Sequence, residues 1–198
     1  MAAISNAKVV ILATHGFEQS ELQVPQQKLR DAGAQVVVVS PEKGQIRGWK
    51  NKDWGESVAV DKSLDEVRAD DYDALVLPGG QINPDLLRIN AQALQLIRDF
   101  LDAGKVVAAV CHAPWLLIEV DAVRDRQVTS YTSIKTDVIN AGGKWIDREV
   151  VTDRGLITSR NPGDLDAFSA KIIEEIQEGS HSGQRGARAK GEPRPSTH

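Results

Sequence analysis

The chain has a single cysteine among its 198 residues, and this scarcity excludes an internal disulfide. A protein without disulfides suits a reducing compartment, so the sequence predicts a cytoplasmic location. No apolar run reaches the roughly 18 residues that a membrane-spanning helix needs, so no contact with a membrane is expected. The N-terminus lacks a basic segment followed by a long apolar run, and we therefore expect no signal peptide.

Motifs for nucleotides and metals are also missing. The sequence contains no G-x-x-x-x-G-K-[ST] loop, and no G-x-G-x-x-G segment follows a predicted strand. It has only four histidines, His15, His112, His181 and His198, and no ligand set with the spacing of a tetrahedral metal site. The sequence therefore predicts neither a metal nor a cofactor. A net charge of −4 gives no indication of nucleic-acid binding.

The composition that is present is typical of a globular protein, with 41% apolar and 26% charged residues. We expect one domain over residues 1–178. The segment 179–198 is rich in Gly, Ser, Pro and Arg, contains no Leu, Ile, Val or aromatic residue, and holds four basic residues and one acidic residue. Such a segment cannot bury enough surface to fold, so it is predicted to be a disordered basic tail.

Short apolar runs alternate with amphipathic stretches along the domain, a pattern typical of βαβ units. The predicted strands are 8–13, 35–40, 73–77, 106–110, 149–152 and 156–159, and the predicted helices are 20–32, 90–104, 133–141 and 164–178. Residues 44–61 are expected to form a hairpin or a loop. The pattern predicts a doubly wound α/β sandwich with a mostly parallel sheet and helices on both faces. In such sheets ligands bind beyond the carboxyl ends of the strands, where 15–18, 78–80 and 111–112 are expected to meet.

Cys111 lies between the predicted strand 106–110 and a predicted helix that starts near His112. A nucleophile at this junction sits on a sharp turn, which needs small neighbours such as Ala109 and Ala113. The start of the helix favours a thiolate at neutral pH. The alternative is that Cys111 is a small buried apolar residue. Since adjacent side chains do not normally face each other, His112 reaches the sulfur only if the turn is tight.

Glu18 and the Gly79-Gly80 pair complete the candidate site. A carboxyl group in a partly apolar crevice has a raised pKa, so a protonated Glu18 can donate a hydrogen bond to the sulfur and move a proton. The alternative for Glu18 is an acidic residue that stabilises the start of its helix. Gly79 and Gly80 let a backbone N–H approach a reacting carbonyl oxygen, and with the N–H of His112 they would form an oxyanion hole. The alternative is a plain turn.

Five segments together, 11–22, 73–80, 108–117, 129–145 and 158–168, resemble the PfpI-type branch of the ThiJ/PfpI superfamily, which is related to class I glutamine amidotransferases. The resemblance implies a flavodoxin-like fold and a cysteine nucleophile, which matches Cys111. It also implies a following histidine and an acid after the first strand, matched by His112 and Glu18. In this family a carboxylate from a neighbouring subunit orients the histidine, and the matching position is Asp85. The chain is therefore expected to form a homodimer or a larger homo-oligomer.

The resemblance implies a stress-response cysteine hydrolase that acts on glyoxal or methylglyoxal adducts, as deglycases and glyoxalases do. Its partners would be small carbonyl compounds or glycated proteins and nucleotides. In this hypothesis Cys111 attacks, Glu18 moves protons, His112 and Asp85 tune the thiolate, and the backbone of Gly79, Gly80 and His112 holds the oxyanion. Two alternatives stay open: an intracellular cysteine peptidase of the PfpI type, and a non-enzymatic redox sensor or chaperone in which Cys111 is oxidised.

Overall fold

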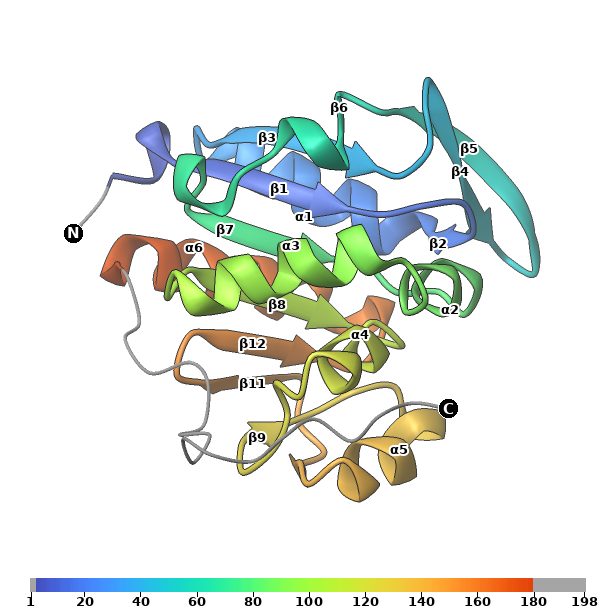
Figure 1. Cartoon of the computed structure of the whole chain (residues 1–198), viewed down its shortest axis with the longest axis vertical. Helices are drawn as coiled ribbons and strands as arrows, with labels where there is room; N and C mark the ends of the chain where they lie inside the picture. Colours follow the sequence, from blue (N-terminus) through green and yellow to red (C-terminus); the bar gives the residue numbers. More distant parts are fainter. Residues whose placement is uncertain (1–2, 180–198) are drawn as a thin grey trace.

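Seven strands form one sheet with helices on both faces, as the computed structural model of residues 3–179 shows (Figure 1). In spatial order the strands are β11 (Val150–Asp153), β12 (Leu156–Ser159), β8 (Val106–Val110), β7 (Ala74–Leu77), β1 (Lys8–Leu12), β3 (Gln35–Ser40) and β6 (Lys62–Ser63). Neighbouring strands are parallel except for the antiparallel pair β11 and β12. The expected tail lies outside the described residues apart from Gly179.

The central strands are apolar without interruption because both of their faces are covered. In β1, Val9 and Ile11 pack into one buried cluster, whereas Val10 and Leu12 pack into a second cluster on the opposite face. This alternation follows from the two-residue period of a strand. The core therefore consists of two apolar layers separated by the sheet.

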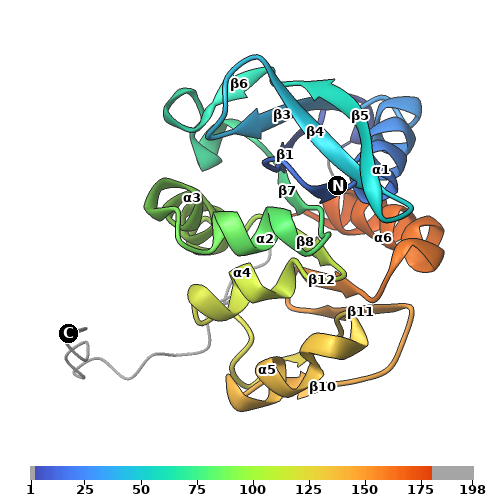
Figure 2. The ribbon, with the colours of Figure 1, turned by 90° about the vertical axis from the view of Figure 1, so that its right-hand side faces the viewer.

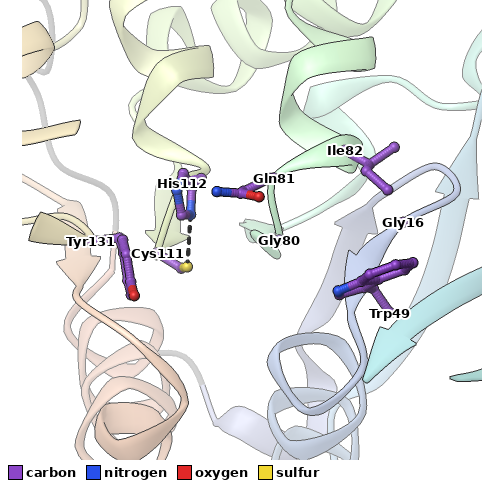
Figure 3. A pocket seen from close by; sticks show the side chains of 8 residues that line it. All are labelled: Gly16, Trp49, Gly80, Gln81, Ile82, Cys111, His112 and Tyr131. Atoms are coloured by element: carbon purple, nitrogen blue, oxygen red, sulfur yellow. Dashed lines mark hydrogen bonds between the residues drawn. The ribbon is translucent and has the colours of Figure 1, made fainter. Parts of the chain in front are cut away.

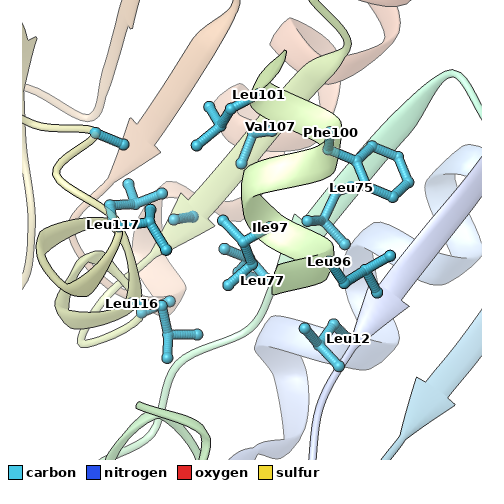
Figure 4. Close-up of a cluster of buried hydrophobic side chains, with 14 of the residues drawn as sticks. Leu12, Leu75, Leu77, Leu96, Ile97, Phe100, Leu101, Val107, Leu116 and Leu117 are labelled. Carbon is cyan, nitrogen blue, oxygen red and sulfur yellow. The ribbon is translucent and has the colours of Figure 1, made fainter. Parts of the chain in front are cut away.

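Helices cover both of these layers (Figure 2). One face carries α2 (Ile82–Leu87), α3 (Ala91–Asp102) and α4 (Pro114–Glu119), and the other carries α1 (Gln19–Asp31) and α6 (Leu165–Glu178). The helix α3 begins where the side chain of Asn90 accepts a hydrogen bond of 2.9 Å from the N–H of Ala93, which is an ordinary N-terminal cap. Figure 4 shows Leu96, Ile97 and Phe100 of α3 pointing toward the sheet residues Leu75 and Leu77.

Two smaller sheets lie beside the main sheet. The strands β4 (Gln45–Lys50) and β5 (Asp53–Ala59) form an antiparallel hairpin, and β2 (Phe17–Glu18) pairs with β4 in parallel. At the opposite end, β9 (Gln127–Val128) and β10 (Lys144–Trp145) pair beside α5 (Lys135–Asn140). The short 3₁₀ helices are η1 (Ile4–Asn6), η2 (Leu64–Glu66), η3 (Ala69–Asp71), η4 (Thr132–Ile134) and η5 (Pro162–Asp164).

The α/β sandwich predicted from the alternating pattern is confirmed, and so is the hairpin within residues 44–61. The helix α2 was not predicted, because it has only six residues and contains a proline. It follows the Gly79-Gly80 turn directly and so helps to form the site. Within the part of the chain that the structure describes, no helix is long and apolar enough to span a membrane.

Candidate active site

A pocket of about 250 Å³ opens at the carboxyl ends of β1, β7 and β8 (Figure 3). Its lining comes from five parts of the chain and consists of Gly16, Trp49, Gly80, Gln81, Ile82, Cys111, His112 and Tyr131. The three segments that follow parallel strands thus meet at one edge of the sheet, as predicted. Trp49 of β4 forms the wall across the pocket from Cys111.

Cys111 occupies the turn between β8 and α4 with a left-handed backbone, φ = 64°. A residue other than glycine rarely adopts this backbone conformation unless its surroundings hold it there. Here the N–H of Cys111 donates to the carbonyl of Ser159 (3.0 Å), and the carbonyl of Cys111 accepts from the N–H of Tyr131 (2.8 Å). These two hydrogen bonds hold the backbone of Cys111 in place. The residue lines the pocket but is only 6% exposed.

The tight turn brings the ring of His112 to the sulfur. Its Nδ1 atom lies 3.1 Å from the Cys111 sulfur, and its Nε2 atom lies 3.1 Å from the hydroxyl oxygen of Ser133. The ring stacks on Tyr131 with 4.8 Å between the ring centroids. Burial lowers the pKa of His112, so the imidazole is neutral at neutral pH and one nitrogen can accept a proton.

The carboxyl group beside the sulfur belongs to Glu21, in the first turn of α1. Glu21 is fully buried, and its Oε2 atom accepts a hydrogen bond of 2.8 Å from the N–H of Gly79. Burial, reinforced by the charge of Glu18, raises the pKa of Glu21 to about 8, while hydrogen bonds with Cys111, Gly79 and Gly80 act in the opposite direction. Glu21 is therefore protonated at neutral pH and can donate a proton into the site.

We expected Glu18 to supply the carboxyl group beside the sulfur, but the structure places Glu18 at the start of α1. Glu18 is the N-terminal cap of α1, where its Oε2 atom accepts a hydrogen bond of 2.9 Å from the N–H of Glu21 and another from the hydroxyl of Ser20. A cap residue directs its side chain at the helix end, whereas a residue three positions later lies within the first turn. Glu21 thus lies on the buried face of α1 with Pro25 and Leu29.

The electrostatics of the sulfur differ from the expectation of a thiolate at neutral pH. Burial raises the pKa of the Cys111 thiol, and a negative charge on Glu21 raises it further. Hydrogen bonds from the backbone N–H groups of Gly80 and His112 lower it. The buried resting site therefore favours the thiol, and the sulfur needs a nearby base when it attacks.

The two glycines have different roles from each other. The N–H of Gly79 is taken up by Glu21, so it is not free to hold an oxyanion, and this part of the expectation is corrected. The N–H of Gly80 acts on the Cys111 sulfur as well as on Glu21, and the N–H of His112 also acts on the sulfur. Gly80 has φ = +79°, and an added Cβ would lie only 2.5 Å from the carbonyl oxygen of Gly16. The close approach of these loops thus requires a glycine.

Asp85 is exposed on α2, and its predicted role across a subunit interface stays a prediction. Within one chain His112 already has a partner for Nε2, namely Ser133. In residues 3–179 no three His, Cys, Asp or Glu side chains lie close enough together to hold a metal ion. The sequence reasoning also missed Trp49 and Tyr131, which reach the pocket from distant parts of the chain.

Comparisons with known proteins show which family the sequence and the fold resemble. The model of the DJ-1/PfpI family matches residues 7–175. The chain is 43% identical to "Deglycase PfpI" of Pyrococcus furiosus over 170 residues, which is 86% of this chain and 99% of that protein. It is 42% identical to "Protein/nucleic acid deglycase 2" of Escherichia coli over 168 residues, 84% of this chain and 95% of that protein. The crystal structure of Drosophila melanogaster DJ-1beta superposes with a TM-score of 0.78 at 29% identity, covering 87% of this chain and 95% of that one.

Proposed function

The chain belongs to the DJ-1/PfpI family, and from this premise we propose that it is a cysteine-dependent hydrolase that removes α-oxoaldehyde adducts from amines. Such adducts form when glyoxal or methylglyoxal reacts with amino groups of proteins or nucleotides. One observation carries the proposal: the Cys111 sulfur lines a pocket, with Nδ1 of His112 3.1 Å away and the buried carboxyl group of Glu21, whose pKa is raised, beside it. Two relatives that share most of their length with this chain are named deglycases.

In this proposal the sulfur of Cys111 attacks the former aldehyde carbon of the adduct, which carries the amine and a hydroxyl group. As the C–S bond forms, the thiol proton passes to Nδ1 of His112, which lies 3.1 Å from the sulfur. The C–N bond breaks, and the amine takes the proton of Glu21 as it leaves. Proton transfers between the two carbons then give a thioester of the 2-hydroxy acid. Water hydrolyses this thioester and restores the thiol, with the N–H groups of Gly80 and His112 as donors to the oxyanion.

The overall reaction balances with one molecule of water. An adduct of an amine with an α-oxoaldehyde plus water gives the free amine and a 2-hydroxy acid. The former aldehyde carbon is oxidised while the neighbouring carbonyl carbon is reduced, so the reaction needs no external oxidant or cofactor. Glu21, which can both give and take a proton near pH 8, suits the proton transfers between these two carbons.

The size of the pocket favours small adducts over polypeptide segments. A volume of about 250 Å³ admits a modified side chain but not several residues of an extended peptide. Trp49 and Tyr131 provide flat walls on which a guanidinium group or a base can stack. We therefore do not favour a peptidase function, and the experiment below tests for it with casein.

We also propose that the active form is a homo-oligomer in the cytoplasm and that Asp85 acts across its interface. Two exposed apolar side chains lie near Asp85. Leu86, in α2, is 47% exposed, and Ile89, just after α2, is 83% exposed. Association through this surface would bury both side chains. The mass of the protein in solution tests this proposal, and a strictly monomeric protein that is fully active would contradict it.

The experiment for the proposed reaction uses N-acetylarginine modified with methylglyoxal. The wild-type protein should release N-acetylarginine and lactate in equal amounts, each followed by chromatography. Free methylglyoxal and casein are assayed in parallel to test for glyoxalase and peptidase activity. Release no faster than in buffer, or cleavage of casein alone, would overturn the proposal.

A further inference from the structure

Asn83, the second residue of α2, is a buried polar residue that lies outside the pocket lining. Its side chain has no exposed surface. The Oδ1 atom accepts a hydrogen bond of 2.8 Å from the N–H of Thr14, and the Nδ2 atom donates to the carbonyls of Pro78 (2.9 Å) and Gly79 (3.1 Å). Asn83 thus connects the carboxyl ends of the adjacent strands β1 and β7.

One of these bonds holds the peptide group between Gly79 and Gly80, which lies beside the sulfur. The carbonyl of Gly79 and the N–H of Gly80 belong to the same planar peptide group and point in opposite directions. Asn83 holds the carbonyl of Gly79, which also accepts a hydrogen bond of 3.3 Å from the N–H of Glu18. Because the carbonyl is held from that side, the N–H of Gly80 faces the opposite side, where Gly80 and Cys111 line the same pocket and the Gly80 backbone hydrogen-bonds both the Cys111 sulfur and Glu21.

This peptide has little intrinsic resistance to rotation. Neither Gly79 nor Gly80 has a Cβ atom, so the backbone on both sides of the peptide can adopt several conformations. A flip of the peptide would turn the carbonyl oxygen of Gly79 toward the sulfur and remove a donor that favours the thiolate. The hydrogen bond from Asn83 opposes that flip, because rotation would leave a buried amide without its acceptor.

We propose that Asn83 is a positioning residue that keeps the N–H of Gly80 directed at the Cys111 sulfur. It touches neither the sulfur nor the pocket and acts only through the Gly79–Gly80 peptide. The inference rests on the proposed function in so far as Cys111 is the nucleophile. The titratable groups that face the sulfur are Glu21 from α1 and the neighbouring His112, with Glu18 behind Glu21, and Asn83 contacts the side chain of none of them.

The test follows the alkylation of Cys111 by iodoacetamide as a function of pH. Asn83→Leu keeps the approximate size of the side chain, adds no charge and loses the amide donors. It should move the alkylation curve to higher pH by about one unit, so that alkylation at a fixed pH below the midpoint slows about tenfold. Turnover should show a lower kcat with KM changed less. Should this variant fail to fold, Asn83→Ser, which is smaller and uncharged, carries the same expectation.

The matched control is Asn90→Ala, which removes an asparagine cap outside the pocket lining and lowers stability without changing a residue of the site. It should keep the wild-type alkylation curve. If the Asn83 variants unfold at lower temperature but retain that curve, Asn83 is only structural and the inference is overturned. Alkylation requires no substrate, so a wild-type protein that fails to release N-acetylarginine would overturn the proposed function while leaving this comparison intact.

Discussion

The Nδ1 atom of His112 lies 3.1 Å from the sulfur of Cys111, although the two residues are neighbours in the sequence. Adjacent side chains on a strand or helix point away from each other. Cys111 instead lies in a turn and has a left-handed backbone, φ = 64°, so the side chains of the two neighbours can face each other. The same turn leaves the sulfur at the pocket and against Glu21, so one strained residue brings the acid, the base and the nucleophile together.

Glu21 is expected to transfer a proton, whereas Glu18 is expected only to cap α1. Substituting each carboxyl group in turn should show this difference. Glu21→Gln should lower kcat about a hundredfold or more, because the amide cannot transfer a proton to the substrate. Glu18→Gln should mainly weaken the helix cap and reduce stability by about 1 kcal/mol, with kcat within a few-fold of wild type. Steady-state kinetics of both variants check this, and the reverse order would contradict the assignment of Glu21.

The raised pKa of Glu21 predicts how stability depends on pH. The carboxyl ionises near 4.5 in the unfolded chain and near 8 in the folded protein. Between these values the folded state binds more protons, so the free energy of unfolding falls as the pH rises. Glu21→Gln should flatten this slope and be more stable than wild type at pH 8. Urea unfolding at pH 5 and pH 8 measures it, with exposed Glu56→Gln as the control.

Gly80 is predicted to be intolerant of any side chain. Gly80→Ala forces alanine into φ = +79°, and its Cβ would lie 2.5 Å from the carbonyl oxygen of Gly16. Gly44→Ala is the matched control, since Gly44 has φ = +78° and nothing lies within 4 Å of an added Cβ. The control should lose about 1–2 kcal/mol from backbone strain alone, and Gly80→Ala should lose more and also lose activity. Equal losses in thermal unfolding and unchanged kinetics would show that the close approach is unimportant.

Trp49 is predicted to bind the part of the substrate that carries the adduct. Its ring lines the pocket and packs edge-on against Trp54, with 5.5 Å between the ring centroids. Trp49→Ala should raise KM for modified N-acetylarginine about tenfold with little change in kcat, because it removes an apolar wall remote from the reacting atoms. Trp54→Ala, which removes the neighbouring ring outside the pocket, should change KM much less. An effect on kcat alone would contradict a binding role.

The sequence predicted the parts of this protein that depend on local pattern. The run of valines at 35–40 became β3 with the predicted bounds, and Asn90 caps α3 as expected. The choice between Glu18 and Glu21 needed the direction of each side chain on the first helical turn. One signal was present, since Glu21, Pro25 and Leu29 share a helical face at intervals of four residues. Asn83 carried no such signal, because its three hydrogen bonds join segments brought together only by the sheet.

The central claim is that the sulfur of Cys111 performs the reaction, and replacing that one atom tests it most directly. The measurement is kcat/KM for release of N-acetylarginine from its methylglyoxal adduct by Cys111→Ser and by wild type at the same pH. The account predicts a loss of at least about a thousandfold, with thermal unfolding unchanged. A Cys111→Ser protein that retains turnover within tenfold of wild type would contradict it.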